Sequence, residues 1–175
     1  MTDTRRDIAR YVNRHPGVHF SGLVDALELA PGQVQYHLRR LGRDGRVVAE
    51  PRYGRTHYFD PEVEPWERRA IAVLRRETAA DVVALVLAEG PTRPTDVAEE
   101  IGIARSTLEW HLDRLVEEGL VEKRRPDGNR VVLSVPEPRT AARLLDTVDA
   151  SIPGRLVDRF ARLVDDLLEG PPPEE

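Results

Sequence analysis

Six polar or aromatic side chains, with no acidic residue among them, lie at helical spacing between residues 33 and 43. Val34, Leu38 and Leu41, at i, i+4 and i+7, form the apolar face of a helix, so the six lie on its outer face. They are Gln33, Gln35, Tyr36, Arg39, Arg40 and Arg43. Glutamine pairs with adenine and arginine with guanine in the major groove of DNA, each giving about 1–3 kcal/mol of discrimination. This face is a candidate for contact with bases, and a solvated helix surface is the alternative.

A basic hairpin follows this helix. Arg52 and Arg55 flank an expected turn at residues 51–55, between expected strands at 46–50 and 56–60. Arginines at a hairpin tip can contact phosphates or a minor groove. The hairpin therefore favours DNA contact over the solvated surface.

The same pattern occurs twice in the chain. Residues 4–58, moved forward by 74 positions, align with residues 78–132 without a gap, so that His37-Leu38 matches His111-Leu112 and Gly45 matches Gly119. A repeat longer than 50 residues, with its own core pattern, is a domain duplication rather than a solenoid.

Each copy predicts three helices and a hairpin. In the first copy Thr4 caps a helix that ends at Pro16-Gly17, Ser21 caps a second helix after a short strand at 18–20, and Gly45 ends the third. In the second copy the corresponding helices start at Thr78 and Thr95, and Leu108, Leu112 and Leu115 form the inner row of the third. Residues 126–129 turn the second hairpin.

This order resembles the winged helix-turn-helix, and the chain resembles the tandem ArsR- and MarR-like regulators common in archaea, especially salt-loving ones. The resemblance rests on residues 34–41 with 45–48 and on residues 106–112 with 119–121, and it covers roughly residues 4–168. It implies a mainly α fold with small β-hairpin wings, in two tandem winged helix-turn-helix domains joined by a linker helix and followed by C-terminal helices. The expected segments are 1–61 (first domain), 62–77 (linker helix), 78–136 (second domain), 137–169 (C-terminal helices) and 170–175 (disordered tail).

The second copy is a weaker candidate for base contact. Its outward residues Arg105, Ser106 and Thr107 precede Glu109 and Asp113, whose carboxylates oppose phosphates. Its wing is strongly basic, with Lys123, Arg124, Arg125 and Arg130. We predict that this wing contacts the DNA backbone while its helix contacts few bases or none. Tyr36 and Trp110 share one repeat position, and packing or DNA contact stays open for both.

Composition excludes several classes of protein. Residues 1–60 carry 10 arginines against 7 acids, a net charge of +3, and residues 61–175 carry 16 Lys and Arg against 24 acids, a net charge of −8. A basic front on an acidic body suggests that the first half meets a polyanion. Cysteine is absent, which excludes disulfides and thiolate sites. No signal peptide or membrane span is evident, so we expect a cytoplasmic, nucleoid-associated protein with no membrane partner.

Neither an enzyme nor a metal site is expected. The sequence has no Gly-rich phosphate loop, nucleophile elbow or HExxH motif. His37 and His111 share one repeat position, where a packing role is favoured over a metal or catalytic role. His15 and His19 bracket Pro16-Gly17 and are interpreted as turn and strand residues. We expect no cofactor and no metal, and the sequence names no small-molecule effector.

The last helix carries Leu156, Phe160, Leu163 and Leu167 at spacings of 4, 3 and 4, a short coiled-coil-like seam. The seam either packs on the second domain or forms a homodimer. A homodimer would place two copies of the first domain about one DNA turn, ~34 Å, apart on a palindromic site.

The leading prediction is a sequence-specific transcription regulator that binds double-stranded DNA, either a repressor or an activator. The alternative is a tandem winged-helix protein-interaction scaffold of a chromosome or transcription complex. The acidic residues of the second copy favour the scaffold, and the arginines of the first oppose it.

Overall fold

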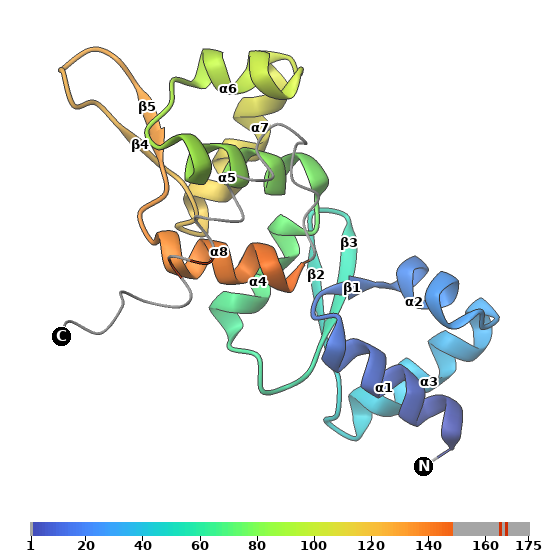
Figure 1. Cartoon of the computed structure of the whole chain (residues 1–175). Helices are drawn as coiled ribbons and strands as arrows, with labels where there is room; N and C mark the ends of the chain where they lie inside the picture. The colour runs from blue at the N-terminus through green and yellow to red at the C-terminus, as the bar shows by residue number, and fades with distance from the viewer. Residues whose placement is uncertain (1, 149–164, 166, 168–175) are drawn as a thin grey trace, which may run out of the picture. The chain divides into compact units, whose positions relative to one another are not determined.

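The computed structural model describes residues 2–148, 165 and 167. The chain divides into two compact units, Met1–Arg75 and Arg76–Glu175. Within the described residues, each unit has three helices, an antiparallel hairpin and a further helix (Figure 1). This mainly helical architecture with small hairpins confirms the predicted fold class.

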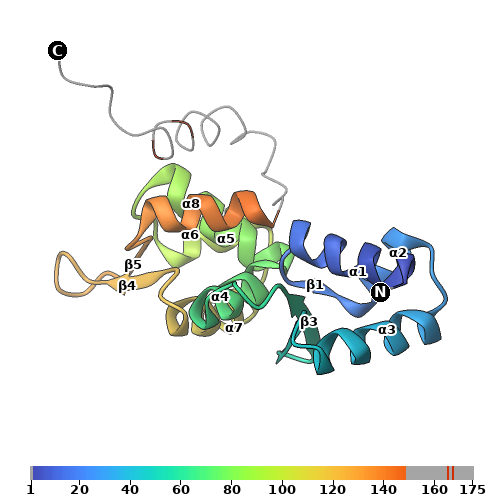
Figure 2. The same cartoon turned by 90° about the horizontal axis from the view of Figure 1, so that it is seen from below.

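The first unit contains a three-helix core and a three-stranded sheet. Its strands lie in the order β1-β3-β2, all antiparallel. Figures 1 and 2 show α1, α2 and α3 packed beside one another, with the hairpin at the end of α3. The elements are α1 (Asp3–Arg14), β1 (Val18–His19), α2 (Phe20–Leu27), α3 (Pro31–Arg43), β2 (Val48–Arg52), β3 (Arg55–Phe59) and α4 (Pro65–Leu74).

The core of the first unit confirms the predicted inner row. Val34, Leu38 and Leu41 on α3 are buried, as are Ile8 and Val12 on α1. Leu23 of α2 and Val47, just before β2, complete the cluster. Because this row is buried, the opposite side of α3 is the side left to solvent.

The starts of the first two helices differ from the prediction. The cap of α1 is Thr2, whose Oγ1 accepts a hydrogen bond from the Arg5 amide at 3.3 Å, and not Thr4. The cap of α2 is His19, whose Nδ1 accepts from the Gly22 amide at 3.0 Å, and not Ser21. A cap needs an extended backbone one residue before the helix, and spacing alone does not locate that residue.

The first wing is tighter than predicted. Its strands are joined by the two residues Tyr53 and Gly54, with Arg52 and Arg55 paired across the turn. Both turn residues have positive φ, 49° and 81°. This is the type I′ geometry that matches the twist of a hairpin, and a tyrosine adopts it at a cost.

Helix α4 lies in the range expected for a linker helix and packs within the first unit. It packs on β2, and Arg75, just after it, donates from Nε and Nη2 to the Pro16 carbonyl at 3.0 and 2.6 Å. Gly17 approaches it so closely that an added Cβ would lie 2.6 Å from Ile71 Cγ2. The helix ends at Leu74 and the next begins at Glu77, so the two are not continuous.

The second unit repeats the first. Helices α6 and α7 begin and end 74 positions after α2 and α3. Helix α8 packs beside α5, as both views show (Figures 1 and 2). The elements are α5 (Glu77–Glu89), α6 (Pro94–Ile101), α7 (Arg105–Glu117), β4 (Glu122–Arg124), β5 (Val132–Ser134) and α8 (Pro138–Thr147).

Two details of the second copy correct the sequence analysis. Helices α5 and α6 start at Glu77 and Pro94 and have no side-chain cap, so Thr78 and Thr95 are not caps. The alignment also gains one residue in the second wing, because Val48 pairs with Phe59 whereas Glu122 pairs with Ser134 instead of with residue 133. The tip of the second wing is correspondingly long, from residue 125 to residue 131.

The C-terminal segment is described only in part. Ala141, Ala142, Leu144 and Leu145 of α8 are buried. Leu156, Phe160 and Leu163 of the predicted seam, and the tail at 170–175, lie outside the described residues. Leu167 is half-buried and lines a cavity beside Val86 and Leu87 of α5.

Candidate nucleic-acid interface

The outer face of α3 carries all six residues predicted to contact DNA. Gln33, Gln35, Tyr36, Arg39, Arg40 and Arg43 are all exposed. Tyr36 is 55% exposed, whereas folded proteins usually bury a large part of a tyrosine side chain. The buried row holds the helix so that these side chains point to solvent together.

The guanidinium groups of this face are not neutralised. Among the described residues, Arg39, Arg40 and Arg43 have no ion pair and no side-chain hydrogen bond. The Gln35 side chain makes no hydrogen bond with a described residue either. A guanidinium without an internal acid keeps its five donors for phosphates or guanine edges.

Gln33 has a local structural role that the sequence analysis did not assign. Its Oε1 accepts a hydrogen bond from the Ala30 amide at 3.4 Å, at the start of α3. A bidentate contact with adenine uses this same oxygen, so the local bond competes with it. Gln33 is therefore a weaker candidate than Gln35 on the same face.

The two wing arginines differ. Arg52 donates from Nε to Glu50 at 2.9 Å, which offsets its charge. Arg55 is exposed and has no ion pair with a described residue. Tyr53, between them, is held at positive φ at the wing tip, a strained position of the kind that clusters at functional sites. The sequence analysis missed Tyr53, although a Tyr-Gly pair in a hairpin turn was a usable signal.

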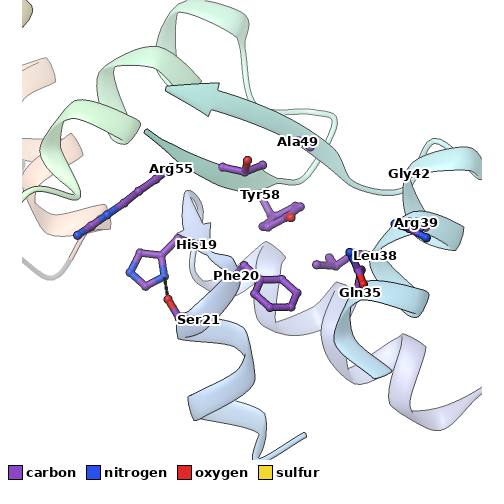
Figure 3. A pocket seen from close by; sticks show the side chains of 11 residues that line it. His19, Phe20, Ser21, Gln35, Leu38, Arg39, Gly42, Ala49, Arg55 and Tyr58 are labelled. Atoms are coloured by element: carbon purple, nitrogen blue, oxygen red, sulfur yellow. Dashed lines mark hydrogen bonds between the residues drawn. The ribbon is translucent and has the colours of Figure 1, made fainter. Parts of the chain in front are cut away.

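A cavity of about 690 Å³ opens between α3 and the wing (Figure 3). Gln35, Leu38 and Arg39 line it from α3, and Tyr58 and Arg55 line it from β3. His19, Phe20 and Ser21 close it at the start of α2. Burial raises the pKa of the Tyr58 hydroxyl, which keeps that group neutral. The sequence analysis did not foresee this cavity, because its walls come from three separate elements.

The repeated histidines are packing residues in this structure. His37 and His111 are each 9% exposed and lie edge-on to Tyr36 and Trp110, with ring centroids 5.2 and 4.9 Å apart. Burial, and then nearby arginines, lower the pKa of both imidazoles, so they are neutral at pH 7. Within the described part of the chain, no cluster of three His or acidic side chains is arranged to hold a metal ion.

The outer face of α7 is occupied by its own ion pairs. Glu109 accepts from Lys123 of the wing at 2.8 Å and from Arg105 at 3.2 Å. The hydrogen bond from Lys123, and then that from Arg105, hold the pKa of Glu109 below its ordinary value. Two predicted DNA-contacting cations are thus joined to one internal carboxylate, whereas Ser106 and Thr107 are exposed.

Trp110 is held by arginines. The Arg114 guanidinium lies 3.3 Å from the centroid of the indole and donates to the Trp110 carbonyl at 2.6 Å. Arg76 lies over the same ring at 5.3 Å. Two cations close to one aromatic ring favour packing over base stacking for Trp110.

The second wing has exposed cations at its base and along its tip. Arg124 lies 3.7 Å from Glu122, and Arg125 donates weakly to the Asn129 carbonyl at 3.5 Å. Arg130 is exposed. These groups are accessible to a polyanion, and their contact with the DNA backbone stays a prediction.

Comparison with known proteins finds a helix-turn-helix family for each of the two copies. Residues 2–71 match a family described as an N-terminal HTH domain, and residues 84–123 match the family "Bacterial regulatory protein, arsR family". An uncharacterized HTH-type transcriptional regulator of Methanocaldococcus jannaschii is 25% identical over 137 residues. That alignment covers 78% of this chain, which spans only 34% of the relative's length.

A solved structure is also similar, at a low level. The crystal structure of ScpB from Mycobacterium tuberculosis aligns with 77% of this chain and 91% of its own, at 17% identity and a TM-score of 0.30. A likeness of that size carries no argument about function. Among the described helices, none is long and apolar enough to cross a membrane.

The folded units, the two family matches and the relative agree on one class of protein and point away from an enzyme. The chain thus contains a helix-turn-helix domain in each copy and is similar to DNA-binding transcriptional regulators, with the arsR family matched in its second copy.

Proposed function

We propose that this regulator recognises a specific DNA sequence by inserting α3 into the major groove. The observation that carries the proposal is the unpaired state of Arg39, Arg40 and Arg43 within the described residues, on a helix whose opposite face is buried. Gln35 and Arg39, one turn apart, lie on the same exposed stripe and suit adenine and guanine edges respectively.

The first wing contacts the DNA backbone in this proposal. Arg55 is the stronger contact, since Arg52 shares its charge with Glu50. Neutralising a phosphate releases a condensed counterion, so each wing contact adds about 0.9 to the salt slope of binding.

The second wing makes weaker, sequence-independent contacts. Lys123, Arg124 and Arg125 can reach phosphates. Helix α7 contacts few bases, because the carboxylates of Glu109 and Asp113 repel the phosphates that flank the groove. In this arrangement the second unit contributes affinity, and the first contributes specificity.

A homodimer through Leu156, Phe160, Leu163 and Leu167 would present two α3 helices to an inverted repeat. The protein would act at chromosomal DNA in the nucleoid. No effector is part of this proposal.

The test is selection of genomic fragments by the purified full chain, at near-physiological salt with competitor DNA. We expect a recurring motif that is lost in the Arg39→Ala/Arg43→Ala variant and retained in Arg139→Ala, which removes an exposed arginine from α8. An inverted repeat within the motif supports the homodimer. Recovery of random fragments only would contradict sequence recognition.

A protein-interaction scaffold is the second candidate, and the acidic face of α7 favours it. A scaffold keeps its partner when Arg39 and Arg43 are reversed in charge, whereas a DNA-binding regulator loses its motif. Affinity capture and DNA selection with the same charge-reversed variant therefore separate the two.

A further inference from the structure

The outer stripe of α7 carries carboxylates that the rest of the described chain does not neutralise. Asp113 and Glu117 are both exposed, and neither has an ion pair or a side-chain hydrogen bond with a described residue. Glu109 belongs to the same stripe but is already held by Lys123 and Arg105. The free negative charge of α7 is therefore concentrated in its last two turns.

These acids do not stabilise the helix that carries them. Glu109, Asp113 and Glu117 lie at i, i+4 and i+8, and like charges one turn apart destabilise a helix. Glu117 is also the last residue of α7, where the negative end of the helix dipole disfavours an anion. A partner that brings cations to this stripe would relieve both penalties.

The chain carries such cations, at the same spacing, on the outer face of α3. Arg39 and Arg43 occupy the repeat positions of Asp113 and Glu117, and neither has an ion pair with a described residue. In both helices the charges recur after four residues, an interval of about 6 Å. Rows of side chains at i, i+4 and i+8 on two helices interdigitate when the helices pack together. The two stripes are therefore complementary in charge and in spacing.

Each stripe is flanked by an exposed apolar side chain. Val116, one turn after Asp113, is 41% exposed, and Tyr36 on α3 is 55% exposed. The repeat counterpart of Val116 is Gly42, so the valine is not required by the shared fold. Interfaces between proteins typically surround an apolar centre with polar and charged residues, which suits this arrangement.

We propose that the α7 stripe of one molecule binds the α3 stripe of a second copy of this chain. The contact is argued from the two surfaces alone. Its consequence, that α7 excludes DNA from α3, rests on the proposed function. The carboxylates of Asp113 and Glu117 then take the place of DNA phosphates against Arg39 and Arg43. Self-association and DNA binding would thus be mutually exclusive at α3.

Sedimentation equilibrium of the full chain tests the contact. We expect weak association, with a Kd on the order of 10–100 µM, because the interface is small. Raising the salt from about 0.05 M to about 0.5 M should weaken it at least about tenfold. Arg39→Asp/Arg43→Glu and Asp113→Arg/Glu117→Arg should each lose this association. An equimolar mixture of the two variants should regain it, since each stripe of one then meets an opposite charge on the other.

The controls separate this contact from other association. Arg14→Asp/Arg139→Glu changes the net charge as much as Arg39→Asp/Arg43→Glu does, at exposed positions outside both stripes, and should associate like the unmodified chain. Association through the C-terminal seam would be equal in all variants, so only mass above that of either variant alone counts. If the basic variant does not fold, as judged by circular dichroism, Asp113→Asn/Glu117→Gln replaces it and should weaken association about tenfold. Association that ignores salt, or a mixture no heavier than its components, would overturn the proposal.

A decoy then tests the exclusion of DNA separately. The Arg39→Asp/Arg43→Glu variant keeps its α7 stripe and is expected not to bind the selected motif. At about ten times the Kd of self-association, it should raise the apparent Kd of the unmodified chain for labelled motif DNA about tenfold, measured by anisotropy. The same decoy with Asp113→Asn/Glu117→Gln added should have no effect. If self-association follows the charges but both decoys act alike, the exclusion of DNA is refuted and the contact stands. If no motif is recovered, the contact stands and the proposed DNA recognition by α3 fails.

Discussion

Helices α3 and α7 have the same length and bury side chains at corresponding positions, but their exposed stripes carry different charges. Gln35, Arg39 and Arg43 on α3 correspond, 74 positions later, to Glu109, Asp113 and Glu117 on α7. The buried rows are Val34, His37, Leu38 and Leu41 on α3, and Leu108, His111, Leu112 and Leu115 on α7. The duplication has thus kept the packing surface and changed the surface that meets a partner.

The buried row and the exposed stripe of these helices are under different physical constraints. A buried apolar row is constrained by the close packing of the core, which penalises changes of volume. An exposed charge is constrained only by what it contacts, because most surface substitutions change stability little. Two copies of one fold can therefore serve different tasks, with base recognition proposed for the first.

The largest effect is expected from exchanging the stripes. The Arg39→Asp/Arg43→Glu variant gives α3 two of the three acidic residues of the α7 stripe, and we expect at least a hundredfold loss of affinity for the selected motif. Its salt slope should fall by about two, since two cations are lost. Fluorescence anisotropy over a salt series measures both quantities. The Arg139→Ala variant serves as control, and a loss of similar size there would contradict the assignment.

A smaller effect of opposite sign is expected at Glu109. The Glu109→Gln variant frees Arg105 and Lys123 from their shared carboxylate. We expect DNA affinity to increase about three- to tenfold, with a salt slope steeper by about one to two. Neutralising Lys123, Arg124 and Arg125 together should reverse the gain and flatten the slope. An unchanged slope in both variants would show that the second unit does not contact DNA.

The pH dependence of stability should distinguish α1 from α5, the first helix of each copy. Burial, and then Glu77, raise the pKa of Asp81 to about 6, above its ordinary value of 3.8. The protonated form is therefore favoured by folding, and its stabilisation is present below about pH 4 and lost as the pH rises through 6. We expect Asp81→Asn to raise the free energy of unfolding by about 1 kcal/mol at pH 7 and to change nothing at pH 4.

The repeat counterpart of Asp81 supplies the control. Asp7 is exposed and lies 3.7 Å from Arg10. Asp7→Asn should cost a few tenths of a kcal/mol at pH 7, with no gain. Urea unfolding at both pH values measures all four free energies, and a gain for Asp7→Asn equal to that for Asp81→Asn would refute the burial argument.

A change in stability of similar size is expected at the tip of the first wing. Tyr53 adopts a φ of 49° in a turn that favours asparagine at this position. Tyr53→Asn should therefore stabilise the first unit by about 1 kcal/mol. Thermal unfolding followed by circular dichroism tests this, and Tyr36→Asn is a control that removes an exposed tyrosine without relieving a turn. A lower midpoint for Tyr53→Asn would mean that the contacts of Tyr53 outweigh its strain.

Local periodicity predicted the elements well and their caps poorly. The inner row of Val34, Leu38 and Leu41 follows from the geometry of a helix, which requires only neighbours within two turns. The cap of α2 depends on the backbone at His19, which the preceding strand fixes through its pairing with β3. For that reason Ser21, the better capping residue by type, is not the cap.

The sequence by itself determined the duplication, the order of the elements and the exposed basic face of α3, because each depends on residue type and spacing along one helix or turn. Only the tertiary structure showed which cations are already paired. Glu109 meets Lys123 fourteen positions away, and three distant segments enclose the cavity beside Arg39. Such contacts depend on how helices and strands pack in space, which spacing within a single element does not specify.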